Sequence, residues 1–207
     1  MEPRSTRLAI VLVTGLFFLW ALAHNLNPIL IPHLRRALQL NDLRSALVDS
    51  AFFIAYFVMA LPAGALMARF GYRSGIVGGL LLFALGAVLF WPAATLRSYP
   101  FFLSALFIIA SGLTFLETAA NPYITALGDP TTAHRRLNFA QAFNGLGAAL
   151  AAFFGGRFIL SGEAPSEDAL KAMAPTALDA FLAQEALAVR MPYLIIALVV
   201  LLAAALF

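Results

Sequence analysis

The sequence predicts an all-α membrane protein: six transmembrane helices arranged as two three-helix repeats. Composition is the first reason, because 62% of the 207 residues are hydrophobic and only 11% are charged, whereas a soluble domain carries about 25% charged residues. The second reason is that the charged residues lie between long uncharged stretches. The third is an Asn-Pro pair that occurs twice, at residues 27–28 and 121–122.

Six stretches are long enough to cross a bilayer, since a helix needs about 20 apolar residues to span a hydrocarbon core of roughly 30 Å. The fourth stretch contains one charged residue, Glu117, and the last is the shortest. Together they predict a single six-helix domain over residues 1–207. The predicted spans are residues 8–34, 46–68, 74–96, 98–128, 137–160 and 191–207.

Residues 161–190 are predicted to form an outer loop with one or two short helices, because Pro and Ser precede helix formers there. Its acidic residues favour a solvated amphipathic cover over a docking site for a partner. The chain has no cysteine, and its arginines are scattered, which argues against a nucleic-acid role. We expect no enzyme activity, cofactor or metal site, because neither a nucleophile and base pair nor a metal-ligand spacing is present.

The two Asn-Pro pairs each follow a long apolar run, one in the first span and one in the fourth. These spans are equivalent if the six helices are two repeats of three. Proline frees a carbonyl one turn back, and in lipid that carbonyl needs a polar partner. Corresponding proline-interrupted helices indicate a transporter binding site, so Pro28 and Pro122 are predicted to break their helices and to act in conformational change. Two ordinary kinked helices are the alternative.

Glu117 is predicted to be a functional carboxylate within the membrane. It stands 17 residues after Pro100 and 12 before Asp129, so neither end of its helix offers easy access to water. An ionisable group at this depth costs on the order of 3 kcal/mol or more and usually faces a cavity, a partner or a proton path. A structural carboxylate that is hydrogen-bonded within the bundle is the alternative.

Amide side chains are predicted to share a face with Glu117. Asn121 lies one helical turn further on, and Gln141 and Asn144 lie at i and i+3 in the fifth span. Amides both donate and accept, so they can hold the hydroxyl groups of a polyol without a charge. The alternative role is interhelical hydrogen bonding, worth about 0.6 kcal/mol each. We therefore expect a neutral, hydroxyl-rich substrate.

Several stretches resemble a known transporter family. Gly64, Arg69, Gly71 and Arg73 form a pattern similar to the cytoplasmic loop between helices two and three of the major facilitator superfamily. The stretches "FFLWALAHNLNPILIPHL", "ALPAGALMARFGY", "GLTFLETAANPYITALG" and "RRLNFAQAFNGLGA" resemble the fucose:proton symporter family, which includes glucose and galactose carriers. The resemblance implies the amino-terminal six-helix half of a twelve-helix carrier.

This resemblance implies secondary active transport of a neutral monosaccharide of fucose, glucose or galactose type, with a proton taken up at Glu117. It implies that Asn25, Gln141 and Asn144 contact the sugar. The loop arginines then lie in the cytoplasm with both termini, in a bacterial inner membrane. The partner would be a second six-helix half: a separate chain, a missing carboxy-terminal half or a second copy.

The chain departs from the family at two positions. Ala68 occupies the place of the acidic residue that usually precedes the loop arginine, and Pro28 replaces the aspartate of the family's "NLND". Asp49 and His24 are the candidates to take over that proton. Asp49 also fits a helix-start carboxylate, and His24 a partner for a freed carbonyl. The alternative functions are an uncoupled facilitator and a six-helix sugar-binding sensor.

Overall fold

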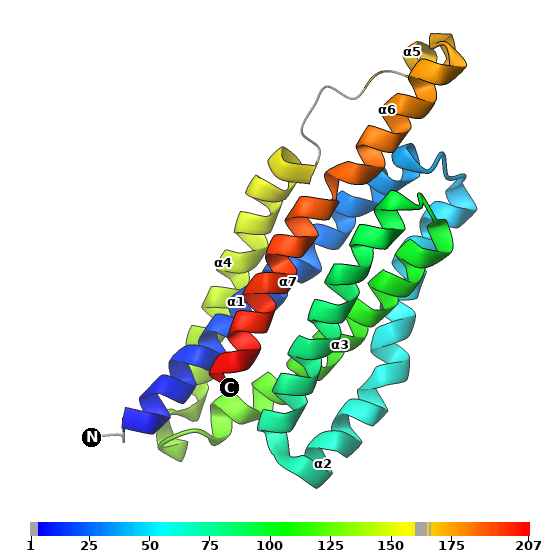
Figure 1. Ribbon diagram of the computed structural model, residues 1–207. Coiled ribbons are helices and arrows are strands. Elements are labelled where there is room, and N and C mark those ends of the chain that lie inside the picture. Colours follow the sequence, from blue (N-terminus) through cyan, green and yellow to red (C-terminus); the bar gives the residue numbers. More distant parts are fainter. Residues whose placement is uncertain (1–3, 160–164, 166) are drawn as a thin grey trace.

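The computed structural model describes residues 4–159, 165 and 167–207 (Figure 1). Within these ranges the chain forms helices joined by short turns, with no strand. Residue 160, the last of the fifth predicted span, and residues 161–164 and 166 of the predicted outer loop lie outside the described part. The elements are α1 (Arg4–Ala37), α2 (Asp42–Thr95), α3 (Tyr99–Ala126), the 3-10 helix η1 (Pro130–Thr132), α4 (Ala133–Ile159), α5 (Glu167–Ala172), α6 (Pro175–Ala188) and α7 (Arg190–Leu206).

α2 consists of two antiparallel segments that meet at Gly71. A straight helix of its 54 residues would be about 80 Å long, but Figure 1 shows the chain reversing at the bottom of α2. Gly71 has φ 80° and ψ 169°, a conformation that glycine adopts without a steric penalty. The reversal explains why one helical element covers two of the predicted spans.

Four helical stretches are long and apolar enough to cross a membrane: Ser5–Ala37, Asp42–Thr95, Tyr99–Ala126 and Pro175–Leu206. α4 is not among them, and its first turns carry Arg135, Arg136 and Asn138. The all-helical membrane class is therefore confirmed, while the count of six crossings stays a prediction. Both chain ends lie in the lower half of the view in Figure 1, and α5 and α6 extend at the other end.

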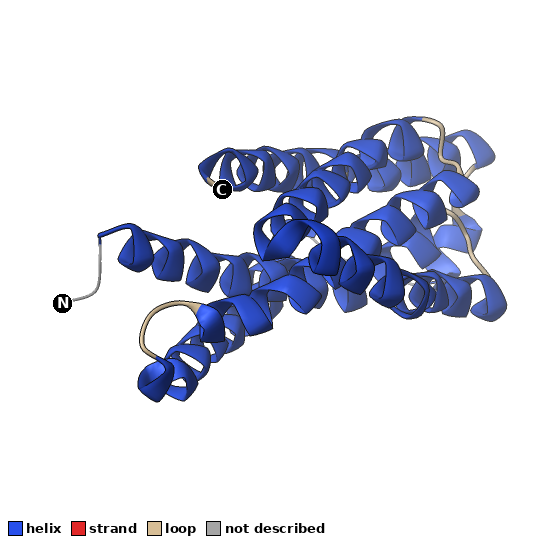
Figure 2. Ribbon diagram, turned by 90° about the horizontal axis from the view of Figure 1, so that it is seen from below, coloured by secondary structure: helices blue, strands red, loops and turns tan. Residues whose placement is uncertain are grey.

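Glycines allow the helices to approach closely. α1 packs mainly against α4, and α2 packs against α3 and α7. Figure 2 shows the bundle from below, with helices joined by loops. A Cβ atom built on Gly112 would lie 2.5 Å from the Gly79 carbonyl oxygen, and one on Gly147 would lie 2.5 Å from the Phe18 carbonyl oxygen. Both contacts are too short for any side chain, so Gly112 sets the α2 to α3 distance and Gly147 the α1 to α4 distance.

Apolar side chains fill the interior and also cover much of the outside. Phe90 of α2 is fully buried and stacks on Tyr193 of α7, with 3.8 Å between ring centroids. Phe57 and Leu61, on the first segment of α2, are 85% and 83% exposed. Exposed apolar side chains on consecutive turns fit a helix that faces lipid or another apolar helix rather than water.

Candidate functional site

Glu117 lies far from both ends of α3, and its side chain is only partly buried. The residues before it, Phe115 and Leu116, are buried in the core. Among the described residues, none donates a hydrogen bond to the Glu117 carboxylate and none forms an ion pair with it. The structure therefore presents a carboxylate that is open to a ligand or a proton, next to buried apolar side chains of the same helix.

Asn121 connects Glu117 to α4. Its Nδ2 donates to the Glu117 main-chain oxygen at 3.0 Å, and its Oδ1 accepts a hydrogen bond from Gln141 Nε2 at 3.3 Å. Gln141 is otherwise exposed. The structure thus brings Gln141 of α4 against Asn121 of α3, one turn after Glu117.

Asn144 points toward α1 rather than α3. Its Nδ2 lies 3.4 Å from the Phe17 carbonyl oxygen. This distance, like the 3.3 Å between Gln141 and Asn121, is longer than the 2.9–3.0 Å typical of an N–H···O bond. Both amides bridge helices, as the alternative role predicted, but through long bonds that a ligand hydroxyl can replace at little cost.

Asn25, on α1, folds back along its own helix. Its Nδ2 donates to the Ala21 carbonyl oxygen at 2.8 Å, one turn earlier, and the side chain is partly exposed. This bond uses one donor and leaves the Asn25 side-chain oxygen without a partner among the described residues. The side chain of Asn27, in the first Asn-Pro pair, lies outside the described ones.

His24 is held at the contact between α1 and the first segment of α2. Its Nδ1 lies 3.5 Å from the Tyr56 hydroxyl, and its ring packs edge-on to Phe52 with 5.4 Å between centroids. The charge of Asp49 acts on the ring from the same side of α2. The two candidates named for the missing aspartate are therefore neighbours in space.

Tyr56 is the residue that the sequence analysis missed. Its hydroxyl accepts a hydrogen bond from the Trp20 side chain and lies beside His24. The negative charge of Glu117 also acts on this hydroxyl. Tyr56 thus has His24 as a contact and Glu117 as a nearby charge. No signal in the sequence marked it, because a tyrosine in the run "AFFIAYFVM" looks like one more core aromatic.

Neither proline breaks its helix, contrary to the expectation. Pro28 and Pro32 lie inside α1, which continues to Ala37, and Pro122 lies inside α3, which continues to Ala126. Instead, the non-helical backbone within α2 is at Gly71. The side-chain hydroxyl of Ser74 donates to the Gly71 carbonyl oxygen at 2.7 Å. This bond gives a partner to a carbonyl group at the point where the chain reverses.

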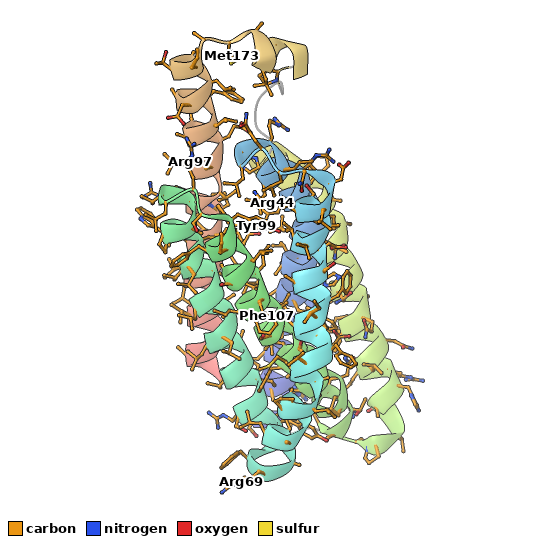
Figure 3. All side chains as sticks on the ribbon, turned by 90° about the vertical axis from the view of Figure 1, so that its right-hand side faces the viewer. Arg44, Arg69, Arg97, Tyr99, Phe107 and Met173 are labelled. Carbon is orange, nitrogen blue, oxygen red and sulfur yellow. The ribbon has the colours of Figure 1, made fainter. Side chains whose placement is uncertain are left out.

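The loop arginines lie at one end of the bundle. Figure 3 shows Arg69 at the bottom, with Arg44 and Arg97 toward the other end. Arg69 and Arg73 are exposed, and Arg69 packs over Phe70 at 5.1 Å. Within the described residues neither forms an ion pair, which agrees with Ala68 in place of an acid. Gly64, further up the same segment, has open space around it.

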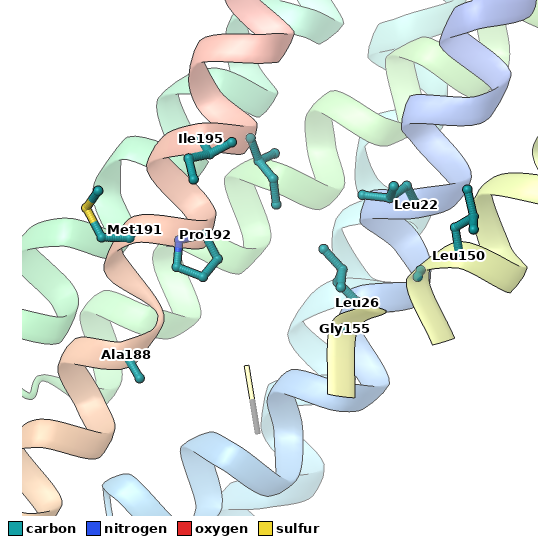
Figure 4. Close-up of a pocket in the computed structure, with 10 residues that line it drawn as sticks. Leu22, Leu26, Leu150, Gly155, Ala188, Met191, Pro192 and Ile195 are labelled. Atoms are coloured by element: carbon teal, nitrogen blue, oxygen red, sulfur yellow. The ribbon is translucent and has the colours of Figure 1, made fainter. Parts of the chain in front are cut away.

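An apolar cavity of about 520 Å³ lies between α1, α4 and α7 (Figure 4). Leu22, Leu26, Leu150, Met191 and Ile195 are among its lining residues. It offers no side-chain donor or acceptor for a hydroxyl group, so it does not suit the predicted substrate. In the described part of the chain, no three His, Asp or Glu residues gather to hold a metal ion.

Comparison with known proteins assigns the family. Residues 11–207 match the family described as Major Facilitator Superfamily. The L-fucose-proton symporter of Escherichia coli is 48% identical over 204 residues, which are 98% of this chain and 47% of that protein. The glucose/galactose transporter of Brucella abortus is 49% identical over 190 residues, which are 92% of this chain and 43% of that protein.

A crystal structure of a Major Facilitator Superfamily transporter, FucP, in the outward conformation superimposes with a TM-score of 0.87 at 48% identity. The match covers 98% of this chain and 49% of the other. The chain thus spans about half the length of the curated relatives it matches. It belongs to the Major Facilitator Superfamily, as a homologue of the amino-terminal half of fucose-proton and glucose/galactose transporters.

Proposed function

We propose that this chain is one half of a secondary transporter for a neutral monosaccharide of fucose, glucose or galactose type. The observation that carries the proposal is the Glu117 carboxylate, partly exposed and without a partner among the described residues, beside the Asn121 to Gln141 bridge. The relatives named as fucose-proton and glucose/galactose transporters support the substrate class. Those relatives are transporters and not enzymes.

Sugar binding would use the amides on the polar face. Gln141 and Asn144 can each exchange a long interhelical bond for a shorter one to a hydroxyl group, and Asn25 offers its oxygen as an acceptor. The Glu117 carboxylate can accept from a further hydroxyl group. A site of this kind recognises hydroxyl positions and carries no fixed positive charge, which suits a neutral sugar.

Proton coupling would begin at Glu117. Tyr56 is next to His24 and within range of the Glu117 charge, and the charge of Asp49 acts on His24 from α2. Glu117 is on α3, Tyr56 and Asp49 are on α2, and His24 is on α1. A proton at Glu117 and the position of α1 can therefore influence each other through α2. Pro28 in place of the helix-one aspartate favours a second candidate function, an uncoupled facilitator, in which the same site equilibrates sugar without protons.

The chain would cross the membrane six times: through α1, the two segments of α2, α3, α4 and the line of α6 and α7. We place both termini and the Arg69 loop in the cytoplasm of a bacterium, with the chain in its inner membrane. The second half of the carrier would be a separate chain, a carboxy-terminal half or a second copy. Relatives about twice as long support a missing half.

The direct test is flux of radiolabelled fucose, glucose and galactose into vesicles that contain this chain, alone and together with a co-expressed carboxy-terminal half from a relative. Uphill uptake driven by a pH gradient supports coupled transport. Flux that only equilibrates the sugar supports the facilitator, and binding without flux supports a sensor. Absence of both binding and flux for all three sugars would refute the sugar assignment.

A further inference from the structure

His33 is a buried histidine at the end of the bundle opposite the N-terminus. It lies on α1 against α6 and is 1% exposed. Its Nε2 is 2.7 Å from the main-chain oxygen of Glu185, which is on α6. A carbonyl oxygen only accepts hydrogen bonds, so Nε2 must carry a hydrogen. In the neutral ring, Nδ1 is then an unprotonated acceptor.

The other side of the same ring faces a second acceptor. Nδ1 lies 3.6 Å from Glu185 Oε2, and both atoms are buried without a hydrogen-bond partner among the described residues. Two acceptor atoms therefore lie next to each other in a closed contact between two helices. A buried acceptor without a donor is unfavourable. One proton placed on Nδ1 would satisfy both atoms, because it gives the ring an N–H to donate to the carboxylate.

The charges around this contact come from two helices. On α6 the charge is Glu185 itself, and on α1 it is Arg36, whose Nη1 is 3.6 Å from the same Oε2. Within the described part of the chain, these are the charged groups that act on the His33 ring, so α2 and α7 add none. The Glu185 side chain is 20% exposed, which gives a proton a route from water to an otherwise closed pair.

We propose that His33 and Glu185 form a proton-binding latch in which a second proton on the His33 ring ties α6 to α1. α6 lies in line with α7, so the latch would fix the outer extension of the last helix. Arg97 of the α2 to α3 turn also holds α6, through Asp179 at 2.7 Å. That ion pair is exposed, whereas the contact between His33 and Glu185 is closed.

This inference rests on the α1 to α6 geometry and not on transport. The proposed orientation decides only which side of the membrane the latch would sense. In that orientation the latch lies on the outer side. Glu117 and the amides of the polar face belong to other contacts, so a failure of the sugar proposal leaves the latch testable by itself.

The test is solid-state NMR of the full chain in lipid, with ¹⁵N-labelled histidine. The chain has three histidines, and His134 is exposed at the start of α4, so it serves as an internal reference for an exposed ring. We expect His33 to show the Nε2–H tautomer at high pH and a doubly protonated ring at low pH. A His33→Gln variant assigns the signal. A ring that stays neutral throughout the pH range in which the chain remains folded would overturn the proposal.

Glu185→Gln is the matched variant, since it keeps the main-chain acceptor and removes only the carboxylate. At a pH where half of the His33 rings are doubly protonated in the unmodified chain, we expect the ratio of charged to neutral rings to fall about tenfold or more in the variant. The His134 signal should not change. An unchanged His33 ratio would show that the carboxylate does not hold the proton, and would also overturn the proposal.

Hydrogen exchange tests the tie between helices. After correction for the intrinsic effect of pH, the amides of α6 should be better protected when His33 is charged, and this gain should be absent in His33→Gln. Glutamine is suitable because it can still donate to the Glu185 carbonyl oxygen. An equal gain in both proteins would mean that the proton does not hold α6, which refutes the latch.

Discussion

The Gln141 side chain donates to Asn121 Oδ1 over 3.3 Å, which joins α4 to α3 one turn beyond Glu117. The bond is long for an amide pair, and the Gln141 side chain is exposed. A fixed interhelical bond would be shorter and buried. The geometry instead suits an amide that holds the helices together when the site is empty and turns to a hydroxyl group when it is filled.

Replacement of Glu117 by Gln should abolish proton-driven accumulation of sugar while the protein still folds and inserts. Glutamine has nearly the same shape, and the carboxylate has no partner among the described residues to lose, so the unfolding temperature should change little. The measurement is uphill uptake of labelled sugar by vesicles with an imposed pH gradient. Accumulation equal to that of the unmodified protein would disprove the role of Glu117.

Replacement of Gln141 or Asn144 by Ala should weaken sugar binding by about 1 to 3 kcal/mol, because a sugar hydroxyl loses its partner. The loss of interhelical bonding alone would instead lower stability by about 0.6 kcal/mol. Equilibrium binding and thermal unfolding, measured on the same samples, separate the two roles. Gln184→Ala is the control, since Gln184 is an exposed amide on α6. Reduced stability with unchanged affinity would assign both amides to packing.

Removal of the Tyr56 hydroxyl should disturb coupling more than packing. In Tyr56→Phe the ring keeps its contact with Phe52, 5.5 Å between centroids, but the hydroxyl group beside His24 is lost. We expect a changed pH profile of uptake with an almost unchanged unfolding temperature. Phe53→Leu, on the exposed side of the same segment, is the control. A pH profile that Tyr56→Phe leaves unaltered would remove Tyr56 from the proton path.

The helices could be predicted from composition because lipid leaves the backbone few alternatives: each apolar stretch must satisfy its own N–H and C=O groups. The reversal at Gly71 lies between the second and third predicted spans for the same reason, since charged residues and glycine gather there. Glu117 was identifiable because a lone carboxylate in an apolar run has few structural explanations.

The remaining features depend on contacts between distant residues. His33 and Glu185 meet across a separation of 152 residues, so no local pattern reveals the pair. Tyr56 becomes interesting only through its neighbours on α1 and α3. The prolines were misjudged for a related reason: Pro28 and Pro122 were expected to break their helices, yet α1 and α3 continue past them, because tertiary packing holds helical backbone through a proline.

Replacement of Arg136 by Leu should destabilise the turn between α3 and α4. Its buried guanidinium donates to the main-chain oxygens of Ile124, Thr125 and Asp129 at 3.2, 3.1 and 2.9 Å. The Ile124 and Thr125 oxygens belong to the last turn of α3, where carbonyl groups lack a partner within the helix. Hydrogen bonds from a charged group contribute about 1.5 to 3 kcal/mol each, though not additively.

We therefore expect a loss of at least about 2 kcal/mol in the free energy of unfolding, measured by denaturant unfolding in detergent. Arg135→Leu is the matched control, because Arg135 is adjacent and exposed and should change stability by less than about 0.5 kcal/mol. Equal effects of the two replacements would show that the Arg136 contacts contribute nothing specific.

The last prediction is that this chain does not carry sugar as a monomer. Asn25, Glu117, Gln141 and Asn144 are all partly or fully exposed, and in an isolated half these polar groups would face lipid, where each is costly. A second half, or a second copy related by a two-fold axis, would cover them. Mass measurement in nanodiscs together with sugar flux on the same material tests this. A strictly monomeric species that transports sugar would contradict it, and with it the proposal that the pathway lies between two halves.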